Sequence, residues 1–124
     1  MKNHIREISL PNGLTVSFHD LTRRYFGDYH QVRMEIVCKI PVLRELFEDQ
    51  EQYDAARSSL GEEVEYRRIE EKMGVPSKEI EQVMEGLFVN FSQNSLPYLS
   101  SAQFPLKMVR AEMGKIKKKG RSIP

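Results

Sequence analysis

The sequence predicts an α+β two-layer sandwich, in which an antiparallel β-meander of three to four strands is covered on one face by two C-terminal helices. Three observations lead to this prediction. Apolar and polar residues alternate over 4–18 and again over 32–42, which is the period of strands that bury one face. Residues 76–94 and the segment after Pro105 instead show helical spacing. A sheet with one apolar face needs a cover, and the two apolar helical stripes supply it.

The first two strands are predicted to form a hairpin around the Pro-Asn-Gly turn at 11–13. A three-residue loop takes a type I turn followed by a left-handed residue, and these three residues suit the positions in that order. The turn places Leu10 opposite Leu14. It also places Ile8 opposite Val16, which is the pairing that the apolar alternation requires.

The middle of the chain is predicted to hold a connection over 20–29, with a turn at Gly27-Asp28, and then a long strand. This strand should bend or stop pairing near Pro41, which lacks an N–H for the ladder. Residues 49–59 form a predicted short helix closed by Gly61. Residues 62–73 fit either a strand or a helix. We favour a strand, because the open edge of a three-stranded sheet would otherwise need covering.

The apolar stripe of 76–94 predicts a helix that begins at a Ser77 cap and ends before Leu96-Pro97. Pro105 suits the first position of a final helix over 105–118. Together the strands and helices predict the core, which comprises Ile8, Leu10, Val16, Phe18, Met34, Ile36, Cys38, Ile80, Val83, Met84, Leu87, Phe88, Phe91, Val109 and Met113.

The length of 124 residues fits one domain, which we place at 1–116, followed by a basic flexible tail at 117–124. The 19 basic and 18 acidic side chains nearly balance, so net charge selects no partner class. The single cysteine, Cys38, excludes an internal disulfide and fits a reducing compartment. No stretch has the pattern of a signal peptide or a membrane span, so we expect a cytoplasmic protein that does not enter a membrane. No motif calls for a cofactor.

Four short motifs resemble an uncharacterised family of small bacterial α+β proteins. They are Asn12-Gly13-Leu14, Gly27-Asp28, Pro97-Tyr98-Leu99 and Phe104-Pro105. The resemblance touches most of the chain and implies an α+β fold. It carries over no activity.

One group of side chains has the composition of a metal site, namely His19, Asp20, Asp28 and His30. A metal-dependent enzyme would need at least three of them to converge on one ion. The strand register points His19 to the side opposite Asp20 and His30. This favours the alternative, in which the four residues lie at the ends of hairpins, form hydrogen bonds and contact solvent. Cys38 lies within the apolar alternation and is interpreted as a core residue. We therefore predict no catalytic residues.

The basic C-terminal segment supports a second hypothesis, in which the chain binds nucleic acid. Its candidate phosphate contacts are Lys115, Lys117, Lys118, Lys119 and Arg121. No aromatic residues that could stack on bases are interleaved there, and lysines at a helix C-terminus also compensate the helix dipole.

The favoured hypothesis is a non-catalytic protein-interaction or accessory module that self-associates. It rests on apolar residues in predicted connections, which a monomer of this size would leave partly uncovered. The candidate interface residues are Tyr25, Phe26, Leu43, Leu46 and Phe47. A strand running on over 40–46 could pair edge to edge across a two-fold axis. The alternative is that these loops fold back as satellite clusters on the monomer.

Overall fold

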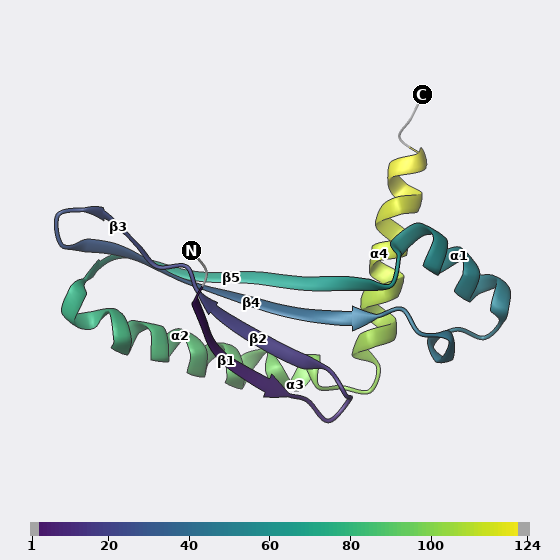
Figure 1. Ribbon diagram of the computed structural model, residues 1–124, viewed down its shortest axis with the longest axis horizontal. Helices are drawn as coiled ribbons and strands as arrows, with labels where there is room; N and C mark the ends of the chain where they lie inside the picture. The colour runs from purple at the N-terminus through teal and green to yellow at the C-terminus, as the bar shows by residue number, and fades with distance from the viewer. Residues whose placement is uncertain (1–2, 122–124) are drawn as a thin grey trace.

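An antiparallel sheet forms one layer of the molecule, and helices cover one of its faces (Figure 1). The computed structural model describes residues 3–121, with side chains described over 5–116. Its strands are β1 Asn3–Ser9, β2 Thr15–Asp20, β3 Arg23–Phe26, β4 Tyr29–Pro41 and β5 Glu63–Pro76. Its helices are η1 Arg44–Leu46, α1 Gln50–Leu60, η2 Ser77–Glu79, α2 Ile80–Asn94, α3 Leu96–Leu99 and α4 Phe104–Arg121. The predicted α+β class is confirmed.

β4 is the central strand of this sheet. β5 pairs with it along its whole length, from the Tyr29–Pro76 pair to the Pro41–Glu63 pair. β2 and β3 pair with successive parts of β4, so they share its other edge. In Figure 1, α2 and α3 run beneath the sheet, while α4 crosses it at the end where α1 lies. The β3–β4 hairpin forms the opposite end of the molecule.

The β1–β2 hairpin has the predicted register. Ile8 pairs with Val16, and the Leu10 N–H donates to the Leu14 carbonyl over 2.7 Å. Gly13 takes the left-handed conformation, with φ +87°. The Asn12 side-chain amide donates to the backbone carbonyls of Leu99 and Ser101, over 2.7 and 2.9 Å. These hydrogen bonds hold the turn against the segment at 99–101.

Two predictions about the middle of the chain need correction. The connection over 20–29 contains a strand, β3, which the sequence did not reveal because all four of its side chains are exposed and show no alternation. The strand expected to run on over 40–46 ends at Pro41, and Arg44–Leu46 form a short 3₁₀ turn instead. The preference for a strand over 62–73 is confirmed, and β5 continues to Pro76.

The bounds and cap of the helices also differ from the prediction. Ser77 does not cap α2 with its own side chain, since 77–79 form a 3₁₀ turn and α2 begins at Ile80. The Ser77 N–H and hydroxyl instead donate to the carboxylate of Asp28, which is 49 residues away in sequence. The segment after Asn94, predicted as a connection, holds the short helix α3. The final helix begins at Phe104 and continues to Arg121, beyond the predicted end at 118.

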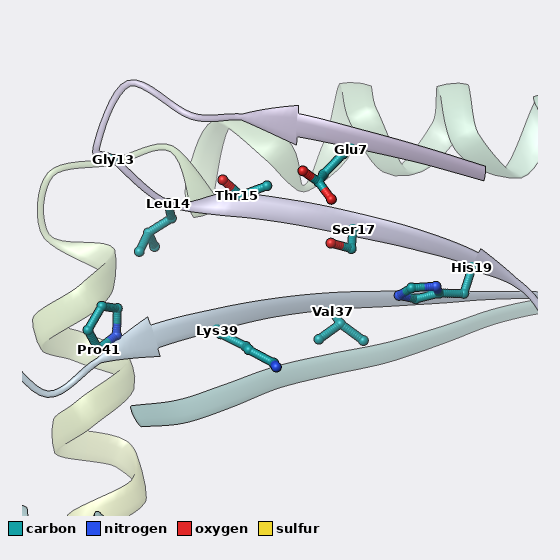
Figure 2. A pocket seen from close by; sticks show the side chains of 9 residues that line it. All are labelled: Glu7, Gly13, Leu14, Thr15, Ser17, His19, Val37, Lys39 and Pro41. Atoms are coloured by element: carbon teal, nitrogen blue, oxygen red, sulfur yellow. The ribbon is translucent and has the colours of Figure 1, made fainter. Parts of the chain in front are cut away.

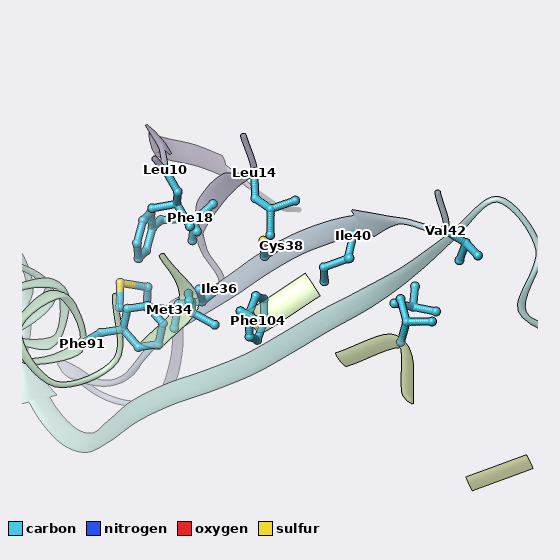
Figure 3. Close-up of a cluster of buried hydrophobic side chains, with 14 of the residues drawn as sticks. Leu10, Leu14, Phe18, Met34, Ile36, Cys38, Ile40, Val42, Phe91 and Phe104 are labelled. Atoms are coloured by element: carbon cyan, nitrogen blue, oxygen red, sulfur yellow. The ribbon is translucent and has the colours of Figure 1, made fainter. Parts of the chain in front are cut away.

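The core lies between the sheet and the helices (Figure 3). The Phe18 ring packs edge to face against Phe91, with the ring centroids 5.8 Å apart. Predicted core residues that are fully buried are Leu10, Val16, Phe18, Met34, Ile36, Cys38, Phe91 and Val109. Those that are only half-buried are Ile8, Ile80, Val83, Met84, Leu87, Phe88 and Met113. Buried residues outside the prediction are Leu14, Val32, Ile40, Val42, Ala56, Val64, Val75, Leu99 and Phe104.

Most of the α2 stripe is less buried than predicted because α2 is a single helix along a long sheet, with solvent on its outer flank. The core instead extends toward the end where α1 and α4 pack. Among the described residues, no helix is both long enough and apolar enough to cross a membrane.

Candidate functional site

Four large apolar side chains are exposed together at the free end of the sheet. Tyr25, Phe26, Tyr29 and Met73 are 47%, 73%, 49% and 55% exposed, and we call them the hairpin-end cluster. Phe26 pairs with Tyr29 across the β3–β4 turn. Gly27 closes this turn with φ +54°, a conformation that side chains with a Cβ adopt only rarely. The cluster therefore presents aromatic rings on a tight, ordered turn.

Hydrogen bonds join the hairpin end to the 3₁₀ turn η2, just before α2. The Asp28 carboxylate accepts from the Ser77 hydroxyl and from its backbone N–H. These bonds favour the ionised form and hold the pKa of Asp28 below its usual value. The His30 Nδ1 lies 3.0 Å from the Asp28 carbonyl oxygen and 3.3 Å from that of Val75. Sequence reasoning missed this link because its partners are distant in the chain.

The other predicted interface residues lie at the opposite end of β4. Leu43 is exposed, whereas Leu46 and Phe47 are half-buried against the core. The Phe47 ring packs against that of Tyr53 in α1, with centroids 5.9 Å apart. The length of β4, about 40 Å at roughly 3.3 Å per residue, separates this group from the hairpin-end cluster. Within one copy the structure does not bring the five predicted residues together.

The sheet face that the helices leave uncovered carries a groove of about 600 Å³ with a mixed polar and apolar lining (Figure 2). Its lining includes Ser17 and His19 from β2 and Val37 and Lys39 from β4. We call this side of the sheet the open face. The polar residues Thr15, Ser17, Arg33 and Glu35 occupy this side, as the strand register shows.

Glu35 is the buried charge of the open face. Its side chain is 1% exposed, and its Oε2 accepts from the Arg67 Nε over 2.6 Å. Arg67 lies on β5, and its own side chain remains half-exposed. The burial of Glu35 could not be predicted from the sequence, because it depends on the register of β5 against β4.

The residues proposed as metal ligands have separate partners. His19 pairs with Glu35 across the open face, on the side predicted for it. The Asp20 carboxylate accepts from the Thr22 N–H over 2.8 Å, and Asp28 is held by Ser77. Over the residues that the structure describes, no three His, Cys, Asp or Glu side chains are placed to hold a metal ion. The geometry thus offers no support for the metal-enzyme hypothesis.

Cys38 is fully buried among apolar side chains. Burial raises the pKa of its thiol to about 11, because the charged thiolate would lose its hydration. Such a thiol is protonated at neutral pH and is a poor nucleophile. Cys38 packs as a small hydrophobic residue.

The basic C-terminal segment is described only in part. Lys115 is exposed, and its Nζ lies 2.9 Å from Glu112 Oε1, one helical turn earlier. The side chains of Lys117, Lys118, Lys119 and Arg121 lie outside the described side chains. The hypothesis of nucleic-acid binding therefore gains no geometric support.

β5 has one open edge. It is 14 residues long and pairs with β4, and no other described strand pairs with it. Its charged side chains lie on both faces of the sheet. Arg68 and Glu70 form an ion pair of 2.8 Å, and Glu71 lies 3.0 Å from Arg33 of β4. An open strand of this length is a ready template for pairing with another chain.

Comparisons with known proteins found no match to a family model, to a curated protein or to a solved structure.

Proposed function

We propose that this chain is a non-catalytic protein-interaction module that self-associates. The observation that carries the proposal is the hairpin-end cluster, in which Phe26 and Tyr29 pair across the turn and all four apolar side chains are exposed. Aromatic residues and methionine are enriched at the centres of protein interfaces. The turn is part of the sheet, and Asp28 in it is hydrogen-bonded to Ser77 just before α2, so a partner would meet a surface that is already ordered.

The surroundings of the cluster favour protein recognition over chemistry. Arg23 and Arg24 precede the cluster, and Arg23 donates to Gln31 over 2.8 Å. Aromatic rings rimmed by polar and charged groups form the usual anatomy of a protein interface. The thiol of Cys38 is buried, and no three His, Cys, Asp or Glu side chains among the described residues are placed to hold a metal ion.

Light scattering across a concentration series tests the proposal. We expect the mass of the protein to rise from monomer toward dimer with concentration. Because burying a phenylalanine side chain is worth roughly 1.5–3 kcal/mol, Phe26→Ser should weaken dimerisation by about tenfold or more. Val89→Ser is the matched control, since Val89 is also exposed but lies on α2.

Two results would count against the proposal. A protein that remains monomeric at the highest concentration would exclude self-association. Equal weakening by Phe26→Ser and Val89→Ser would remove the special role of the hairpin-end cluster.

A further inference from the structure

We infer that the second copy adds to the sheet at the outer edge of β5, running antiparallel to it, with the two-fold axis at Ile69. The inference rests on the proposed function and gives its partner a surface and a register. A residue that precedes Ile69 by a given number of positions then faces the residue that follows Ile69 by the same number in the other copy. Arg67 thus faces Glu71, and Tyr66 faces Lys72.

The β5 edge is the longest edge available for such pairing. β1 offers seven residues and β3 offers four, whereas β5 offers 14. The regular stretch that is symmetric about Ile69 begins at Tyr66 and ends at Lys72, because a bulge shifts the register of β5 between Lys72 and Val75. Paired positions over 66–72 provide backbone hydrogen bonds, which are the main source of affinity when one strand adds to another sheet.

The two faces of the sheet restrict the register. From Glu63 to Lys72, before a bulge shifts the register, odd-numbered residues of β5 pair with the open-face residues of β4, as Arg67 does with Val37 and Ile69 with Glu35. A two-fold axis perpendicular to the sheet joins open face to open face. Residues directly opposite one another must therefore both be odd or both be even. The axis then passes through a residue and not between two.

Charge selects Ile69 among the residues through which the axis could pass. With the axis there, Arg68 faces Glu70 and Arg67 faces Glu71, and symmetry repeats both pairs. Opposite charges directly across an antiparallel pair stabilise it, and like charges destabilise it. The one uncharged residue in this central stretch, Ile69, meets its own copy on the axis.

The neighbouring registers are unfavourable. With the axis at Arg68, this side chain meets its own copy and Glu65 meets Glu71. With the axis at Glu70, that carboxylate meets its own copy and Arg68 meets Lys72. Charged residues on an open edge normally protect it from pairing with other strands. Here they exclude the neighbouring registers and permit one.

The same register brings opposite ends of the two copies together. The two copies run in opposite directions, so the hairpin end of one lies beside the α1 end of the other. Met73, the member of the hairpin-end cluster that lies on β5, comes just after the paired stretch. The Val42 N–H donates to the Glu62 carbonyl, next to the start of β5, and Leu43 follows Val42. Met73 of one copy is thereby brought toward Leu43 of the other, whereas Tyr25 and Phe26 remain on β3, on the far side of β4.

Disulfide trapping tests the register. In the Ile69→Cys protein, the two introduced thiols should lie on opposite residues, with Cα atoms about 4.5–5.5 Å apart, which suits a disulfide. We expect mild oxidation to give a covalent dimer, whose linked peptides mass spectrometry identifies. Cys38 is buried and should remain unlinked. Glu65→Cys is the control, because its copies would lie about 26 Å apart, eight residues along the strand.

Charge exchange tests the same register without a cross-link. Arg68→Glu places two like-charged pairs across the axis and should raise the dissociation constant of the dimer by about tenfold. The double variant Arg68→Glu/Glu70→Arg restores opposite charges in both copies and should recover the affinity. Circular dichroism checks that each variant is folded.

The results separate the inference from the proposed function. A monomeric wild-type protein would overturn both. A dimer that yields no disulfide at residue 69 and shows no recovery in the double variant would overturn the β5 register and leave self-association standing. Equal cross-linking at residues 65 and 69 would likewise overturn the register.

Discussion

The guanidinium Nε of Arg67 lies 2.6 Å from the Oε2 of Glu35, and this contact joins β5 to β4 on the open face. The two partners differ in exposure, since Glu35 is buried and Arg67 is half-exposed. The arginine therefore covers the carboxylate while its own outer side remains in solvent. An uncompensated carboxylate in this position would be unfavourable, because burial removes its hydration.

Arg67→Met should lower the free energy of unfolding by roughly 1.5–3 kcal/mol, the usual range for a hydrogen bond to a charged group. Urea denaturation at low protein concentration measures the change. Arg68→Met is the control on the same strand. Its ion pair with Glu70 is more exposed and should contribute less than about 1 kcal/mol. Equal losses in the two variants would show that Glu35 does not depend on Arg67.

Phe91→Ala should destabilise the protein by roughly 3–5 kcal/mol, because the ring is buried in the core and its removal leaves a cavity. Phe88→Ala should have a smaller effect. Phe88 contacts the Phe18 ring, with centroids 5.0 Å apart, but it is only half-buried. Thermal unfolding of the two variants compares them directly. A larger loss for Phe88→Ala would contradict the packing of α2.

The Asp28 contact predicts a dependence on pH. The hydrogen bonds from Ser77 lower the pKa of Asp28 in the folded protein below 3.8. The stabilisation is therefore present above pH 3.8 and is lost as the pH falls through the folded pKa. An NMR titration of the carboxyl carbon should give a pKa below 3.8 in the wild type and a higher one in Ser77→Ala. The same pKa in both proteins would show that Ser77 is not the cause.

Local signals predicted much of the fold. The turn at 11–13 determined the register of the first hairpin, because turn type depends on a few adjacent residues. The alternation over 32–42 located β4 for a similar reason. β3 was missed because exposed residues on both faces leave no alternation to detect. Ser77 was expected to cap α2, whereas its N–H and hydroxyl donate to Asp28, and a contact across 49 residues has no local signature.

The candidate site was predictable in part. Tyr25 and Phe26 were identified as surplus apolar residues, and they are exposed. Leu46 and Phe47 were identified by the same reasoning, but the α1 end folds back and covers part of them. Composition alone does not distinguish a loop that folds back from one that stays in solvent. The open edge of β5 can be recognised only when the pairing of the whole sheet is known. The sequence fitted either a strand or a helix over 62–73, so this pairing could not be derived from it.

The bonds from Asn12 to the carbonyls of Leu99 and Ser101 bear on how the chain is made. They join positions 87 and 89 residues apart, so the first hairpin acquires this anchor only after Ser101 has left the ribosome. Contacts of such long range slow folding, because the intervening chain must be ordered first. The first two strands must therefore wait with their apolar face uncovered until the helices that cover it have been synthesised. This is the interval in which a nascent chain depends most on chaperones.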